Sequence, residues 1–210
     1  AYDAAKQHSE AIDFRETAPA AANRDTYLNT QGEVDHPRLR HSHQAAGTPG
    51  TVAGLALAHA RHGRLPWKTL VEPAIRLAGG FPVSRELAQS LQEARDWLAP
   101  WPASMKVFFK ADGSAYQPGE MLAQPDLAAA LRLIADQGPR AFYEGELAQK
   151  LATDMQAHQG LITLDDLKNY RAVVRAPVRG TYRGYQIASM PPPSSGGVHL
   201  IQILNILETG

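Results

Sequence analysis

An arginine near the start of the chain is the first residue whose type and position suit binding. Arg15 stands in "IDFRE", directly after a strand-like apolar run, and the ends of strands often carry binding residues. Its planar guanidinium can hold a carboxylate or a phosphate through two parallel hydrogen bonds. Because many arginines serve in ordinary salt bridges, the alternative is an ion pair with Asp13, Glu16 or Asp25. The residues alone favour the salt bridge, with the binding role as the alternative.

The second candidate is the turn "MPPPSSGG" at residues 190–197. Proline fixes φ and removes a backbone donor, while glycine opens conformations that other residues avoid, so this run is neither helix nor strand. Ser194 and Ser195 do not fit the Gly-x-Ser-x-Gly pattern of a nucleophile elbow, and the local histidine that could serve as a base is His199. We therefore expect a shaped loop whose backbone amides and hydroxyls line a pocket.

The glycine-rich stretch "GTPGTVAG" at residues 47–54 leads into a predicted helix. Helix N-termini attract anions, but a phosphate-binding loop of the Walker type needs a Lys-Ser/Thr pair after its last glycine. Leu55 and Ala56 stand there instead. We predict a tight turn that feeds a closely packed helix.

Three histidines gather in one polar loop, where His36 is followed by His41 and His43. We recognise no carboxylate or further histidine at the spacing of ligands on one helix face, so we expect no metal site. The acid pair Asp165–Asp166 is interpreted as the start of a helix, where carboxylates are favoured, and not as an acid/base pair.

Composition narrows the class of protein. The chain has 210 residues with 44% apolar content, enough for one good-sized core. Lysine plus arginine and aspartate plus glutamate number 21 each, which gives no support to a nucleic-acid partner. The absence of cysteine excludes disulfides and a cysteine nucleophile. No apolar run is long enough for a transmembrane helix, so membrane insertion is not expected.

The elements that must position these residues are mostly helical. Apolar periodicity, caps and breakers predict helices after Pro19, from Thr51 to Gly63, from Pro66 to Gly79 with a kink or break at Glu72, from Ser84 to Leu98, from Pro125 to Gly138, from Arg140 to Ala157 with a flaw at Gly145, over "TLDDLKNY", and from about Gly197. Residues 29–50 are predicted as a polar loop, and a hairpin is possible around Asp112-Gly113. Strands are predicted before Arg15 and, as a pair, within "AVVRAPVRGTYRGYQIASM".

This order predicts one partial domain over residues 1–210, with a helical lobe at about 48–170 and β-containing edges at 1–15 and 171–197. The fold class is therefore mostly α with short β segments at both ends. The sheet must largely come from elsewhere, and both chain ends suggest a piece of a longer protein.

Three stretches together resemble the γ-glutamyltranspeptidase family: "AIDFRETAPAAANRDTYL", "SHQAAGTPGTVAGLALA" and "YRGYQIASMPPPSSGGVHLIQILNILE". The resemblance covers essentially the whole chain. It implies part of an αββα N-terminal-nucleophile hydrolase fold, in which a precursor cleaves itself into a large and a small subunit. The small subunit's N-terminal threonine then attacks the γ-glutamyl amide of glutathione or another γ-glutamyl donor. The acyl group passes to water, an amino acid or a dipeptide.

The resemblance also assigns residues. Arg15 matches the arginine that grips the α-carboxylate of the γ-glutamyl group, while Ser194, Ser195, Gly196 and Gly197 match a loop that shapes the pocket. No catalytic residue is expected in this chain, which corresponds to the central and later part of the large subunit and is predicted to be inactive alone.

The family resemblance implies that no cofactor and no metal is needed, that the partner is the small subunit, and that the location is periplasmic or secreted. Two alternatives stay open. One is a related acylase, acting on cephalosporins or on poly-γ-glutamate, and the other is a non-catalytic helical binding scaffold.

Overall fold

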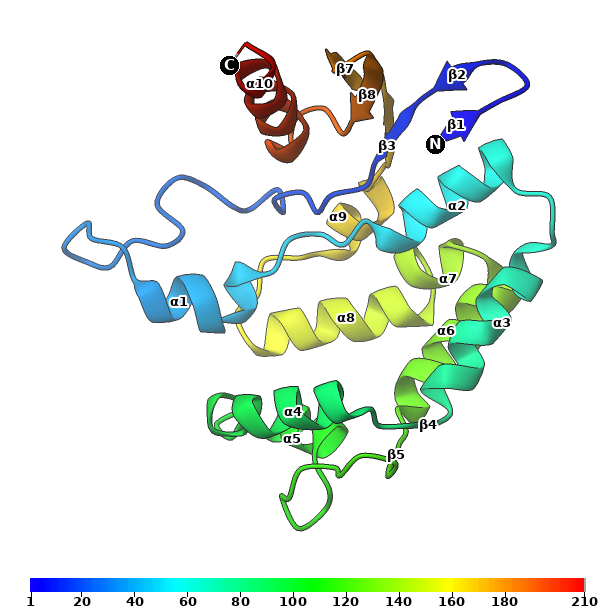
Figure 1. Ribbon diagram of the computed structural model, residues 1–210. Coiled ribbons are helices and arrows are strands. Elements are labelled where there is room, and N and C mark those ends of the chain that lie inside the picture. The colour runs from blue at the N-terminus through cyan, green and yellow to red at the C-terminus, as the bar shows by residue number, and fades with distance from the viewer. Residues whose placement is uncertain (210) are drawn as a thin grey trace. The chain divides into compact units, whose positions relative to one another are not determined.

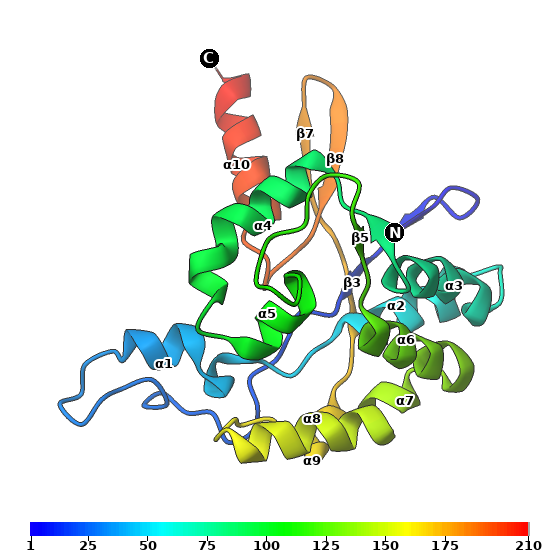
Figure 2. The same cartoon turned by 90° about the horizontal axis from the view of Figure 1, so that it is seen from below.

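A computed structural model describes residues 1–209 (Figures 1 and 2). The backbone contacts divide it into two compact units, one formed by residues 1–62 with the chain from residue 142 onward, and the other by residues 63–141. Among the described residues, none of the helices is both long enough and apolar enough to cross a membrane.

The first unit combines small antiparallel pairs of strands with helices. Its elements are β1 (Tyr2–Asp3), β2 (His8–Ser9), β3 (Ala11–Asp13), α1 (His36–His41), the 3-10 helix η1 (His43–Ala45), α2 (Thr51–His62), α8 (Glu146–Ala157), α9 (Leu164–Asn169), β6 (Val173–Arg175), β7 (Val178–Tyr182), β8 (Tyr185–Ser189) and α10 (Gly196–Glu208). The short helix α7 (Arg140–Tyr143) leads into it. β1 pairs with β2, β3 with β6, and β7 with β8.

Helix α10 packs beside the β7–β8 hairpin (Figures 1 and 2). Gly180 in β7 allows this approach, because a Cβ there would lie 2.6 Å from Cγ2 of Ile201. Another side of α10 is left exposed and apolar, at Leu200, Ile203, Ile206 and Leu207.

The second unit is built on helices. Its elements are α3 (Trp67–Ala78), β4 (Phe81–Pro82), α4 (Arg85–Leu98), α5 (Pro102–Phe108), β5 (Met121–Leu122) and α6 (Pro125–Gln137). Helices α3 and α6 pack side by side, and the Trp67 indole N–H donates to the Ile134 carbonyl at 2.9 Å. A buried cluster of Val83, Ala88, Leu91 and Leu122 forms its core.

Several predicted elements are confirmed. The helices after Thr51 and Pro125 are present, Ser84 caps α4, and a capping box between Thr163 and Asp166 starts α9. α10 begins within one residue of its predicted start. These elements were predictable because their caps and breakers are local and strong.

Other predictions were wrong. No helix follows Pro19, because Asn23 and Thr26 satisfy nearby backbone amides in turns, with Asp25 N donating to the Asn23 side chain at 2.9 Å. The predicted loop 29–50 contains α1, whose N-terminus Asp35 caps by accepting from Arg38 N at 3.0 Å.

Proline, glycine and strand signals had mixed outcomes. Of the kink or break predicted at Glu72, the break is wrong, because α3 runs through Pro73 and its packing on α6 offsets the lost hydrogen bond. The flaw predicted at Gly145 is confirmed, since the helix is interrupted there and α7 and α8 are separate. The turn at Asp112-Gly113 closes no strand hairpin, and the unpredicted α5 precedes it. The predicted strand pair after residue 171 is three strands.

Candidate functional site

The segment around Arg15 is held by the pairing of β3 with β6, in which Asp13 lies opposite Val173. Asp13 is buried, and it accepts from Arg175 Nε at 2.7 Å and from the Arg15 backbone amide at 3.2 Å. The hydrogen bond from Arg175 is the main cause that lowers the pKa of the Asp13 carboxyl below its ordinary value. The ion pair of Asp13 with Arg175 therefore holds the backbone that carries Arg15.

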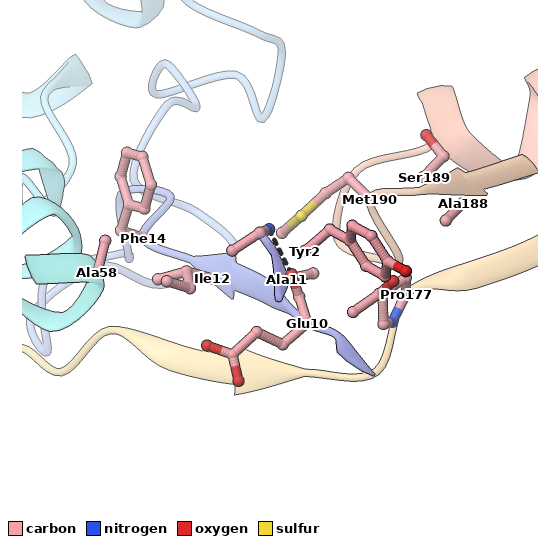
Figure 3. A pocket seen from close by; sticks show the side chains of 12 residues that line it. Tyr2, Glu10, Ala11, Ile12, Phe14, Ala58, Pro177, Ala188, Ser189 and Met190 are labelled. Atoms are coloured by element: carbon pink, nitrogen blue, oxygen red, sulfur yellow. Dashed lines mark hydrogen bonds between the residues drawn. The ribbon is translucent and has the colours of Figure 1, made fainter. Parts of the chain in front are cut away.

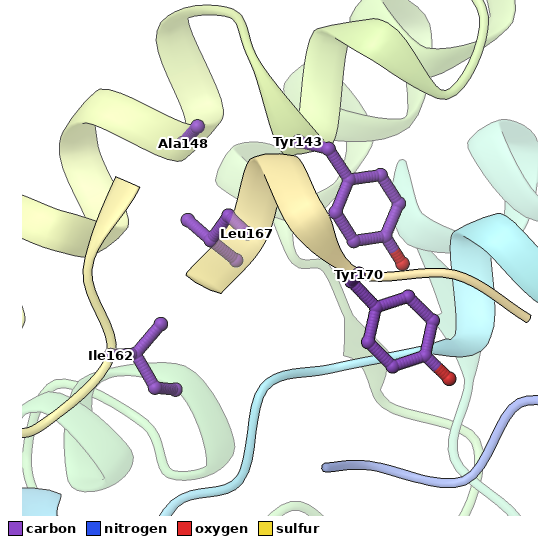
Figure 4. Close-up of a cluster of buried hydrophobic side chains, with 5 residues drawn as sticks. All are labelled: Tyr143, Ala148, Ile162, Leu167 and Tyr170. Carbon is purple, nitrogen blue, oxygen red and sulfur yellow. The ribbon is translucent and has the colours of Figure 1, made fainter. Parts of the chain in front are cut away.

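A tyrosine fixes the same backbone from the other side. The Tyr170 hydroxyl donates to the Arg15 carbonyl at 2.8 Å. Burial raises the pKa of Tyr170 to about 12, so this hydroxyl stays a donor throughout the neutral range. Its ring stacks on Tyr143 with centroids 5.8 Å apart, within a cluster that includes Ala148, Ile162 and Leu167 (Figure 4). The candidate site thus rests directly on the core of its unit.

The glycines of "GTPGTVAG" allow this packing. A Cβ on Gly50 would lie 2.0 Å from both the Phe14 carbonyl oxygen and the Tyr170 hydroxyl, and one on Gly54 would lie 2.1 Å from the Phe14 ring. Any side chain at these positions would push α2 away from the residue next to Arg15. The prediction of a tight turn feeding a closely packed helix is confirmed.

The guanidinium of Arg15 is open to solvent, with its side chain 57% exposed. Of the three acids considered as partners, Glu16 contacts it, with Nε 3.5 Å from Oε1. Nη1 also donates to the Pro193 carbonyl at 3.4 Å. The structure therefore brings Arg15 beside the "MPPPSSGG" loop, although 178 positions separate the two residues in the sequence.

The loop itself is an irregular entry into α10. Ser194 N donates to the Pro191 carbonyl at 3.2 Å, and the helix starts at Gly196 after Ser195, whose side chain makes no capping hydrogen bond. The first amides of a helix have no acceptor within it and carry partial positive charge. Arg15 and the start of α10 together form a region suited to a negatively charged group.

The two glycines of the loop differ in their surroundings. A Cβ on Gly197 would lie 2.2 Å from the Met190 carbonyl oxygen, whereas one on Gly196 would meet only Ser194 Oγ, at 3.7 Å. Gly197 is thus required for α10 to approach the end of β8. Gly196 is exposed and leaves open space beside the serines.

A cavity of about 620 Å³ lies nearby, lined mainly by apolar residues of the β1–β3 segment and by Met190 (Figure 3). Arg15, Ser194 and Ser195 do not line it. The cavity therefore adjoins the candidate site, because Phe14 and Met190 line it, but it does not contain the residues to which the resemblance gives a role.

Sequence reasoning missed the residues that support Arg15. Tyr143, Tyr170 and Arg175 come from segments far away in the sequence, and an isolated tyrosine or arginine carries no local signal of such a role. The structure also brings His43, and neither His36 nor His41, beside Asp154 and His158, as described below.

Known proteins of similar sequence identify the family of this chain. The sequence profile of the family described as Gamma-glutamyltranspeptidase matches residues 1–210. The chain is 48% identical over 202 residues to a glutathione hydrolase proenzyme from Escherichia coli, covering 96% of this chain and 35% of that protein. It is also 42% identical over 204 residues to an acylase ACY 1 proenzyme from a Pseudomonas strain, covering 94% of this chain and 36% of that protein.

Among solved structures, the γ-glutamyltranspeptidase of Helicobacter pylori superposes with a TM-score of 0.94 at 42% identity, over 98% of this chain and 59% of that chain. The fold is thus part of that of the N-terminal-nucleophile hydrolases, as predicted. Within this class the chain belongs to the γ-glutamyltranspeptidase family. It spans about a third of the length of the curated relatives it matches.

Proposed function

We propose that this chain is the large-subunit portion of a γ-glutamyltransferase or glutathione hydrolase, and that Arg15 binds the α-carboxylate of the γ-glutamyl donor. The observation that carries the proposal is the position of Arg15. Its backbone is held by Asp13 and Tyr170, while its guanidinium stays exposed beside the loop at Pro193.

The present contacts of the guanidinium are weak enough to be exchanged for substrate. The ion pair with Glu16 is solvent-exposed, and such pairs contribute about 0–1 kcal/mol. A substrate carboxylate that accepts two parallel, charge-assisted hydrogen bonds binds more strongly than this. The rigid backbone then gives the bound donor one orientation, which lowers the entropic barrier to attack on its γ-carbonyl.

The catalytic nucleophile is proposed to lie on the small subunit, outside these residues. The hydroxyl of its N-terminal threonine attacks the γ-glutamyl carbonyl while the threonine's own amine accepts the hydroxyl proton. The amide C–N bond breaks, the leaving amine takes that proton, and a γ-glutamyl ester forms on the threonine. Water, an amino acid or a dipeptide then takes the acyl group. This chain alone is expected to be inactive.

The pocket-shaping role of Ser194, Ser195, Gly196 and Gly197 belongs to the same proposal. Their support is the contact of Arg15 with this loop at Pro193 and the free amides at the start of α10. We further propose that the remaining chain of the precursor covers the exposed apolar side of α10. We also propose a periplasmic or secreted location, which is what the family resemblance implies.

A second candidate is an acylase of the same class, since an acylase proenzyme is 42% identical to this chain. The glutathione hydrolase from Escherichia coli is more similar, at 48% identity.

The test uses the full-length protein after self-cleavage, with γ-glutamyl-p-nitroanilide as donor. Losing hydrogen bonds to a charged group costs about 1.5–3 kcal/mol, so Arg15→Ala should raise the donor KM by roughly 10- to 150-fold. Arg24→Ala is the matched control, because Arg24 is 92% exposed and its ion-pair partner among residues 1–209 is its neighbour Asp25. Equal KM values in the two variants would refute the role of Arg15. Self-cleavage without γ-glutamyl release in the unmodified protein would favour the acylase.

A further inference from the structure

Two histidines and an aspartate meet on the surface of the first unit, away from Arg15. His43 Nε2 lies 3.2 Å from Asp154 Oδ2, and His158 Nδ1 lies 3.2 Å from Asp154 Oδ1. The two imidazole rings are stacked, with centroids 4.4 Å apart and planes inclined by 11°. One donor atom from each of the three residues lies within 4.8 Å of the other two.

Two of the three residues are placed by helix α8. Asp154 and His158 are separated by four positions, which puts both side chains on one face at the C-terminal end of the helix. The helix stops directly afterwards, because Gln159 takes a left-handed conformation with φ of +60° and Gly160 N donates to the Met155 carbonyl. The carbonyl end of a helix carries partial negative charge, so a cation is favoured at this position.

The third residue comes from η1, which follows α1 and lies beside the end of α8 (Figures 1 and 2). The Tyr27 hydroxyl donates to the Gln44 carbonyl at 2.9 Å and holds the backbone next to His43. Gly160 lets the chain pass beneath this histidine, because a Cβ on Gly160 would lie 3.1 Å from the His43 Cβ. His43 is therefore positioned by packing on both sides.

We propose that His43, Asp154 and His158 form a binding site for a divalent transition-metal ion such as Zn²⁺, Co²⁺ or Ni²⁺. Imidazole nitrogens and a carboxylate oxygen are the donors that these ions take in proteins. Around a tetrahedral zinc with bonds of about 2.0–2.2 Å, neighbouring donor atoms are roughly 3.3 Å apart. Each histidine nitrogen already lies 3.2 Å from an Asp154 oxygen, His43 Nε2 from Oδ2 and His158 Nδ1 from Oδ1. Because the two rings are stacked, one of them has to turn for both nitrogens to point at the same ion.

Metal binding would replace contacts that the ring makes now. His158 Nδ1 lies 2.9 Å from the Asp154 backbone carbonyl oxygen and 3.2 Å from its carboxylate, and the ion would take the place of these contacts at Nδ1. Three protein ligands leave at least one coordination position to water, and the side chains are partly exposed. The site is therefore an exchangeable one and unlike a closed structural zinc site.

A bound ion would tie the segment of α1 and η1 to α8. This segment leads directly to Thr48, whose backbone pairs with Thr17 near Arg15. The proposal departs from the sequence-based expectation of no metal, which overlooked the four-residue spacing of Asp154 and His158. It does not depend on the proposed transferase function.

The experiment measures Co²⁺ binding to the full-length, tag-free protein after removal of metals with a chelator. Equilibrium dialysis gives the number of bound ions, and the visible absorption of Co²⁺ reports nitrogen ligation. His43→Ala and His158→Ala should each bind one equivalent less than the unmodified protein. His36→Ala is the matched control from the same segment, and it should bind as much as the unmodified protein.

A second readout tests the tether without using activity. Zn²⁺ should slow tryptic cleavage at Arg38 and Arg40 in the unmodified protein and in His36→Ala, but not in His43→Ala. Equal Co²⁺ stoichiometry in all variants would overturn the proposal, as would binding that does not saturate. Asp154→Asn keeps the size and polarity of the side chain. If this variant binds one equivalent of Co²⁺ less, the cause is a lost ligand and not misfolding.

Discussion

The Tyr143 hydroxyl acts as the N-terminal cap of α2, although it comes from a different part of the chain. It accepts from Ala53 N at 3.1 Å and donates to the Pro49 carbonyl at 2.8 Å. The ring itself is buried, and its stacking partner is Tyr170. Tyr143→Phe keeps this ring and removes only the oxygen, which leaves one amide and one carbonyl without their partner.

The expected magnitude follows from two lost hydrogen bonds. Each contributes about 1 kcal/mol net, so the start of α2 should be destabilised by about 2 kcal/mol. Since 1.4 kcal/mol is a factor of ten, the amides of this turn should exchange with solvent roughly 30-fold faster. Local exchange is the right observable because it does not require the whole protein to unfold in two states.

The assay is hydrogen exchange followed by mass spectrometry on the full-length protein, read on peptides that cover residues 48–56. Tyr185→Phe is the matched control, since Tyr185 is 74% exposed and undergoes the same chemical change. Protection in Tyr143→Phe that stays within about threefold of this control would refute the capping role, because the calculated effect is roughly tenfold larger.

Two further predictions concern packing and pH. Gly197→Ala should lower the free energy of unfolding by about 1–3 kcal/mol, because its methyl group would meet the Met190 carbonyl oxygen at 2.2 Å, whereas Gly196→Ala should be near neutral. Thermal unfolding of the full-length protein measures both, and equal effects would contradict the packing argument. The hydrogen bond from Arg61 is the main cause that lowers the pKa of Glu10 from 4.5 to about 2. Its stabilisation is therefore present above pH 4.5 and is lost as the pH falls towards 2, so chemical denaturation should show a flatter pH dependence over that range in Arg61→Met. An unchanged slope would show that this ion pair does not set the pKa.

The sequence predicted those elements whose signals are local. Pro125 and the capping box at Thr163 mark helix starts that the structure confirms. The family and the fold class could also be predicted, because "IDFRE" and "MPPPSSGG" stand at a spacing that resembles the γ-glutamyltranspeptidase family. The break considered at Glu72 does not occur, since a helix held by its neighbour can tolerate a proline that would break it in isolation.

The supports of the candidate site could not be predicted in the same way. The contact of Arg15 with the Pro193 carbonyl and its hydrogen bond from Tyr170 both join residues more than 150 positions apart. Their side chains have no periodicity or motif that specifies a partner. The role of Gly50 was recognised as packing, but the group it packs against became visible only in the structure.

The central claim is that Arg15 recognises the α-carboxylate of a γ-glutamyl donor. The most direct measurement compares kcat/KM of the full-length protein for γ-glutamyl-p-nitroanilide and for its α-carboxamide analogue, in the unmodified protein and in Arg15→Ala. We predict that the unmodified protein prefers the carboxylate by roughly 10- to 150-fold and that Arg15→Ala loses most of this preference. A preference that persists undiminished in Arg15→Ala would contradict the account.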